Sequence, residues 1–208
     1  MEKTPDALHH YQQALGIIES LIAADPSDKG FSHYLSLTHL AVGQMLAQLG
    51  DTGKALDNYR KATEISETLL ASDPSKMETR FDLAKTYASA GSLLTTINKL
   101  DEASRYLQKA TSLQEMLAHT DAQNARAQGD LADVYFKVAE YYAKLAASAE
   151  TSTGKREENL CEAQMFYQRS LDIWQQLRER GTLRGADAKK SSEVAHQMAS
   201  IAKTGGWR

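Results

Sequence analysis

The chain has 208 residues, of which 25% are charged, and its formal net charge is -3 at pH 7. No run of like charges occurs, so the sequence lacks the electrostatic footprint of a protein that binds a nucleic-acid backbone or an anionic membrane. It also lacks a secretory signal at Met1 to His10 and any stretch of roughly 20 apolar residues that would insert into a bilayer.

Residue usage favours helices along the whole chain. Prolines are few, and Ala, Leu, Gln, Lys and Glu are abundant, so we expect an all-α fold. Cys161 is the only cysteine, which excludes an internal disulfide and a cysteine-based zinc cluster within one chain. A reducing, cytoplasmic setting fits this usage best.

The first expected element is a helix over residues 5–24, and three units follow it over residues 25–72, 73–120 and 121–180. The motif Asp-Pro-Ser begins the first two units, and Asp121 begins the third. The interval is constant, since 73 − 25 = 48 and 121 − 73 = 48. Each Asp-Pro pair is predicted to end the helix before it, because proline disfavours the α conformation in the preceding residue.

Two sets of positions keep this register. The earlier set is Leu35, Leu83 and Leu131; His39, Tyr87 and Tyr135; Gly43, Gly91 and Ala139. The later set is Ala7, Ala55 and Ala103; Tyr11, Tyr59 and Leu107; Ala14, Ala62 and Ala110; Ile17, Ile65 and Leu113; Leu21, Leu69 and Leu117. Within a copy the intervals are three or four residues, which indicates one helical face. Each unit is therefore predicted to hold two amphipathic helices, called here the first helix and the second helix.

Short polar turns are expected between the two helices. The segments Gly50-Asp51-Thr52-Gly53 and Asn98-Lys99-Leu100-Asp101 supply residues that favour turns. Ser75, with Glu78 three residues later, predicts a capping box at the start of the next first helix.

The two ends of the array differ from its middle. Ala163 aligns with Ala103 at 163 − 103 = 60, so the third unit holds 60 − 48 = 12 additional residues near 147–160. We expect a longer helix pair with a mobile tip there. A last helix over 187–203 is predicted to cap the array. The helix over 5–24 resembles a second helix whose first helix is missing, so we expect the chain, a single repeat domain over 1–208, to be the carboxy-terminal piece of something longer.

The repeating positions resemble the tetratricopeptide repeat. The matching small, turn, aromatic and closing positions are Gly43, Gly50-Asp51, Ala55, Tyr59, Ala62 and Pro74. The resemblance implies a right-handed α-α superhelix, or solenoid, of antiparallel helix pairs that binds a protein or peptide. The family's usual period is about 34 residues, and two helices lengthened by about seven residues each would explain 48. The long-period array also resembles the tails that follow bacterial serine/threonine kinase domains.

In this family the first helices line a concave groove, and residues that vary between copies are candidates for specificity. The resemblance implies a mildly polar groove with one exposed aromatic residue, Phe136. The predicted groove residues are Leu37, Leu40, Gln44, Lys85, Ser92, Thr95, Asp133, Phe136 and Glu140. The same positions could also form only a solvated helix face.

No catalytic or cofactor chemistry is predicted. The six histidines are scattered, and His39 occupies the slot of Tyr87 and Tyr135, so we expect it to be a core residue. No phosphate-binding glycine motif occurs, and Cys161 is expected to pack as a small apolar residue. We therefore expect neither an enzyme nor a resident cofactor or metal.

Two functions stay open. The favoured one is an interaction scaffold that binds a peptide or helix, as the regulatory or sensor part of a larger signalling protein. The alternative is a self-associating structural module, in which the uncovered amino-terminal helix and the capping segment meet neighbouring copies in a homo-oligomer.

Overall fold

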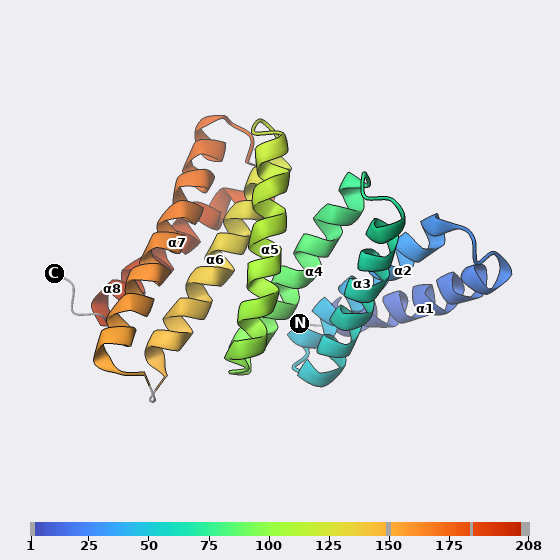
Figure 1. The fold of residues 1–208 in the computed structure, drawn as a ribbon, viewed down its shortest axis with the longest axis horizontal. Coiled ribbons are helices and arrows are strands. Elements are labelled where there is room, and N and C mark those ends of the chain that lie inside the picture. Colours follow the sequence, from blue (N-terminus) through green and yellow to red (C-terminus); the bar gives the residue numbers. More distant parts are fainter. Residues whose placement is uncertain (1–2, 149–150, 184, 205–208) are drawn as a thin grey trace. The chain divides into compact units, whose positions relative to one another are not determined.

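The computed structural model describes residues 3–148, 151–183 and 185–204. Every regular element in these ranges is a helix, which confirms the predicted all-α fold (Figure 1). The chain divides into two compact units, Met1–Leu93 and Leu94–Arg208. The expectation of one repeat domain over 1–208 stays a prediction.

The first unit holds α1 (Lys3–Ala24), α2 (Lys29–Gln48), α3 (Thr52–Ser72) and most of α4 (Met77–Thr96). Consecutive helices pack on one another, α1 against α2 and α2 against α3. Small residues allow the close approach of α2 and α3. The best example is Gly43, where an added Cβ atom would come within 2.7 Å of the Tyr59 ring.

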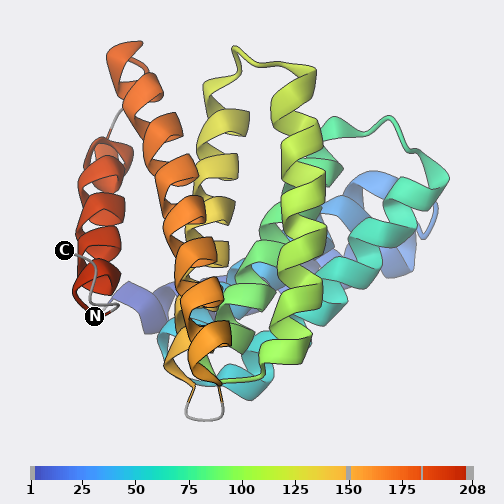
Figure 2. The same cartoon turned by 60° about the vertical axis from the view of Figure 1, so that its left-hand side comes forward.

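The second unit holds α5 (Leu100–Thr120), α6 (Ala125–Ala147), α7 (Thr153–Glu179), the 3-10 helix η1 (Gly185–Lys189) and α8 (Lys190–Thr204). These helices also pack in chain order, as Figure 2 shows for α5, α6, α7 and α8. Val194 of α8 is buried in one core cluster with Trp174 of α7. The last helix therefore packs its apolar side on α7.

The turns before α2, α4 and α6 share one hydrogen-bonding pattern. The side chain of Asp25 accepts from the backbone N–H of Ser27, and Asp73 and Asp121 accept in the same way from Ser75 and Gln123. The serine hydroxyls of the first two turns also donate to these carboxylates, which lowers the pKa of Asp25 and of Asp73.

This pattern overturns the predicted capping box. Ser75 lies two residues before Met77, where α4 begins, and its hydroxyl donates to Asp73. The aspartate side chain precedes the serine in the chain and captures its hydroxyl within the turn.

Tyrosine–glutamate hydrogen bonds recur in both units. The Tyr87 hydroxyl donates to the Glu67 carboxylate, and the Tyr135 hydroxyl donates to Glu115 across 2.8 Å. In the first copy His39 replaces the tyrosine. Its ring is buried, as predicted, and its Nδ1 lies 2.9 Å from Asn58 Oδ1.

The additional residues of the third unit are mostly helical. α6 has 23 residues and α7 has 27, against 20 in α2 and 21 in α3. Both helices of this pair are thus longer than those of the first pair. Part of the predicted tip, residues 149–150, lies outside the described residues.

Candidate functional site

The predicted groove residues differ in exposure. On α2 and α4 of the first unit, Leu37, Gln44 and Ser92 are half-buried and Lys85 is exposed. Leu40 is only 4% exposed, and Thr95 on the last turn of α4 is only 7% exposed. Their side chains mainly fill the core, because the positions that face the groove adjoin the core-facing stripe of the same helix.

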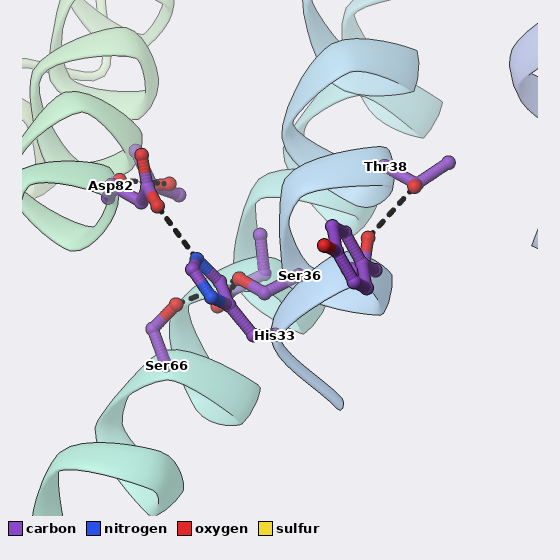
Figure 3. A network of polar contacts seen from close by, with 8 residues as sticks. His33, Ser36, Thr38, Ser66 and Asp82 are labelled. Carbon is purple, nitrogen blue, oxygen red and sulfur yellow. Dashed lines mark hydrogen bonds and ion pairs between the residues drawn. The ribbon is translucent and has the colours of Figure 1, made fainter. Parts of the chain in front are cut away.

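The first helices of the first unit are joined by a hydrogen bond that the sequence analysis did not predict. His33 Nε2 on α2 lies 2.8 Å from Asp82 Oδ2 on α4 (Figure 3). Leu37 lies four residues after His33, and Lys85 lies three residues after Asp82. Each therefore shares a helical face with one member of the pair, so two predicted groove positions lie near the contact between α2 and α4. His33 and Asp82 occupy different positions within their own copies, which is why comparing the copies did not reveal the pair.

A second polar cluster in Figure 3 lies inside the helix pair and has a structural role. The Ser36 hydroxyl donates to the Ala62 carbonyl oxygen across 2.9 Å and lies 2.7 Å from the Ser66 hydroxyl. Thr38 donates to the Tyr34 carbonyl oxygen within α2. These groups are satisfied and offer nothing to a ligand.

In the second unit the predicted groove residues of α6 adjoin α8. Asp133 Oδ1 accepts a hydrogen bond of 3.0 Å from the Lys190 ammonium. Burial raises the pKa of Glu140, the Lys137 charge lowers it and the Glu193 charge raises it, with a net increase. This part of the predicted surface is therefore polar and partly neutralised by lysines.

The expectation that Phe136 is an exposed aromatic residue was wrong. Its ring is half-buried and packs edge-to-face on Tyr167, with the ring centroids 5.5 Å apart. It also packs against the core cluster that holds Trp174 and Val194. Phe136 therefore stabilises the α6–α7 pair, and a ligand could reach only part of its ring.

Each unit also has a hollow between two second helices, which the sequence did not indicate. In the first unit a hollow of about 490 Å³ lies among α1, α2 and α3, and in the second a hollow of about 240 Å³ lies among α5, α6 and α7. They are equivalent in the repeat register. The second is smaller because Tyr142 and Phe166 stand where the first has Leu46 and Asn58.

The larger hollow is chemically mixed. Its wall includes His39, whose pKa is lowered by burial despite the hydrogen bond to Asn58, so the imidazole is neutral at pH 7. Glu19 and Lys61 stand at its edge.

Cys161 is exposed, which contradicts the expectation that it packs as an apolar residue. It lies on the side of α7 nearly opposite the buried stripe, where Ala163 and Tyr167 face the core, because successive residues of a helix are rotated by about 100°. Within the described ranges, no three His, Cys, Asp or Glu side chains are placed to hold a metal ion. None of the described helices has the length and hydropathy needed to cross a bilayer.

A family model described as tetratricopeptide repeat matches residues 38–69 and 84–115. One similar solved structure is that of BtubC (BKLC) from P. vanneervenii, which is 16% identical in sequence. The alignment covers 98% of this chain and 84% of that chain, with a TM-score of 0.40. A de novo designed helical repeat protein is 12% identical, and the alignment covers 98% of this chain and 97% of that chain, with a TM-score of 0.38. No curated protein matches this sequence. Two segments of the chain therefore match the model of the tetratricopeptide repeat, a repeat that is typical of protein–protein interaction scaffolds.

Proposed function

We propose that this chain is an interaction module that binds a peptide or helix of a partner protein across its first helices. The observation that carries the proposal is the combination of tetratricopeptide repeats with accessible, non-repeating side chains on α2 and α4. Leu37, Gln44 and Lys85 offer apolar, amide and cationic contacts, and the His33–Asp82 hydrogen bond joins their two helices. Such a surface suits a segment that mixes apolar anchors with acidic residues.

The proposal includes a period of 48 residues for the first two copies. It is supported by the helix starts, because α2 and α4 begin at Lys29 and Met77, and α3 and α5 begin at Thr52 and Leu100. Both intervals are 48 residues, since 77 − 29 = 48 and 100 − 52 = 48. Lengthened helices add exposed turns to a first helix and therefore more positions for contact.

The proposed biological setting is the cytoplasmic regulatory or sensor part of a larger signalling protein. It rests on the resemblance to the repeat tails of bacterial serine/threonine kinases. Co-expression with a candidate kinase domain, followed by measurement of kinase activity with and without the tail, would test it. Equal activity in both cases would contradict a regulatory role.

Binding can be tested with a displayed library of random peptides, selected on the intact chain and then measured singly by fluorescence anisotropy. We expect Lys85→Glu to weaken binding of the selected acidic peptides at least roughly ten-fold, because it replaces attraction with repulsion. Lys61→Glu on α3 is the matched control, since it makes the same charge change on an exposed second-helix residue. An equal loss from both variants, or none from either, would remove the groove from consideration.

Phe136→Ala is a poor test of the groove in this structure. The ring packs on Tyr167, so its removal would lower stability as well as binding. Glu140→Gln changes charge with little change of volume and is the better variant in the second unit.

The second candidate function, self-association, is favoured by one observation on α1. Tyr11, Ile17 and Leu21 are exposed large apolar residues on that helix. An apolar surface of this kind is suited to a contact with a second copy of the chain.

A further inference from the structure

Three exposed apolar side chains of α1 occupy positions that are buried or half-buried on the other second helices. Tyr11 is 40% exposed, whereas its equivalent Tyr59 on α3 is 3% exposed. Leu21 is 40% exposed, whereas its equivalent Leu117 on α5 is 1% exposed. Ile17, at 63%, is the most exposed of the three. α1 therefore presents the large apolar side chains of this face to solvent, while the small residues Ala7 and Ala14 of the same face are half-buried.

On α3 the covering element is the first helix of the same copy. Tyr59 packs on Gly43 of α2, and the Ala62 carbonyl oxygen accepts a hydrogen bond from Ser36 of α2. The α6–α7 pair repeats this arrangement, with Ala132 and Ala139 of α6 in one core cluster with Tyr167 of α7. A second helix is thus covered by a first helix that carries small residues seven positions apart.

The helix at the other end, α8, has this stripe and leaves it uncovered. With the offset of 60 residues in the third unit, Ser192 and Ala199 of α8 are equivalent to Ala132 and Ala139 of α6. Ala132 and Ala139 are completely buried, whereas Ser192 and Ala199 are exposed.

The opposite face of α8 confirms this register. Val194 is 1% exposed against α7, and its equivalent Val134 of α6 is 3% exposed. α8 therefore packs as a first helix whose second helix is absent from the described structure, and α1 is a second helix without a first helix.

We infer that α1 of one copy docks on the Ser192–Ala199 face of α8 in a second copy, so that the two half-repeats form one complete repeat. The inference rests on the self-association candidate and involves none of the predicted groove residues. Such a contact joins two different faces, so each copy offers one donor face and one acceptor face. Burial of Tyr11 and Leu21 and partial burial of Ile17 would provide the main stabilisation, since Tyr59 and Leu117 are buried and Ile65 is half-buried at the equivalent positions.

Two exposed positions allow the faces to be blocked separately. Ile17→Glu blocks α1 and Ala199→Glu blocks α8, and neither residue is buried, so the fold should be retained. Each change would place an unpaired carboxylate in the contact and weaken it by roughly 100-fold or more. Ser20→Glu on α1 and Ser200→Glu on α8 are controls, because they add the same charge to exposed positions outside the two stripes.

Sedimentation velocity over a range of concentrations gives the readout. We expect the mass of the unchanged chain and of both controls to rise with concentration, and each blocked variant alone to stay monomeric. An equimolar mixture of the two blocked variants should form a dimer and nothing larger, because one intact α8 face meets one intact α1 face. This rescue also shows that both variants are folded.

A monomeric unchanged chain would overturn the inference. Association of Ala199→Glu alone, as expected if α1 paired with α1 or with another surface, would also overturn it, as would failure of the mixture to form a dimer. Peptide binding by Ile17→Glu is measured separately. Its retention or loss reports on the groove and leaves the result on self-association unaffected.

Discussion

The ring of Tyr59 on α3 lies directly against Gly43 on α2. A Cβ atom on residue 43 would come within 2.7 Å of Tyr59 Cε1 and 3.2 Å of the Ala55 carbonyl oxygen. Tyr59 is 3% exposed, so its ring is enclosed and cannot withdraw without disturbing its neighbours. The closest approach of the two helices therefore depends on a residue that has no side chain.

We expect Gly43→Ala to lower the free energy of unfolding by about 1 to 2 kcal/mol, measured by urea denaturation. Overpacking in a core outweighs the gain of about 1 kcal/mol that alanine has over glycine inside a helix. Gly16→Ala on α1 is the matched control, because no atom lies within 4 Å of its added Cβ. It should stabilise the chain, and an equal gain at residue 43 would mean that the Tyr59 ring moves aside easily.

Alkaline pH should destabilise the fold through its buried tyrosines. Burial raises the pKa of Tyr59 from 10.0 to about 12, and burial followed by the hydrogen bond to Glu115 raises that of Tyr135 to about 12. The folded chain thus holds these protons more tightly than the unfolded chain. Their contribution to stability is complete below pH 10 and is lost as the pH rises from 10 to 12.

The loss should be roughly 2 kcal/mol for each of these tyrosines, followed by circular dichroism together with tyrosinate absorbance. Tyr59→Phe removes one ionisable group while keeping the ring, so its unfolding free energy should fall less steeply over that range. An unchanged slope would contradict the assignment to Tyr59.

The two serines between α2 and α3 should show strong coupling in a double-mutant cycle. Ser36 and Ser66 are 2% and 0% exposed, and the Ser36 hydroxyl, bonded to the Ala62 carbonyl, accepts from Ser66. Ser36→Ala strands the Ser66 hydroxyl and should cost about 1 to 3 kcal/mol, whereas Ser66→Ala should cost about 1 kcal/mol.

The double variant should cost no more than Ser36→Ala alone, because a buried hydroxyl is then no longer left without a partner. Ala84 and Ala132 occupy the equivalent of position 36, so alanine fits there sterically. Thermal unfolding of the four proteins gives the coupling energy, and simple additivity would refute the hydrogen-bonded pair.

Cys161 should react with a thiol reagent in the folded chain, because its side chain is exposed on α7. Modification should proceed without denaturant and leave the melting temperature unchanged. Cys161→Ser should abolish the reaction and also preserve stability to within about 0.5 kcal/mol. A requirement for denaturant would support the original expectation of a packed cysteine.

Periodic patterns predicted the helices well because each helix must bury one stripe of apolar residues. The expected elements over 5–24 and 187–203 are α1 and η1 with α8, and the repeated units contain the expected helix pairs. The capping box at Ser75 failed because local hydrogen bonds compete within a turn. The sequence offers both Asp73 and Glu78 as neighbours of Ser75, and it does not show that the Ser75 hydroxyl donates to Asp73.

The candidate site was predicted less completely. Equivalence between copies predicted which positions face a groove, and it could not distinguish accessible Lys85 from buried Leu40 and Thr95. The prediction for Cys161 was wrong because closeness in sequence to the core residue Ala163 is not closeness on the helix: two residues correspond to a rotation of about 200°, which places Cys161 on the opposite side.

By itself, the sequence determined the helical class and predicted a repeat register, because both depend on the order of small, apolar and polar residues along a helix. Only the tertiary structure decided that His33 pairs with Asp82, that Phe136 packs on Tyr167 and that the α1 stripe is open to solvent. Such contacts depend on the distance between side chains of different helices, and packing sets that distance.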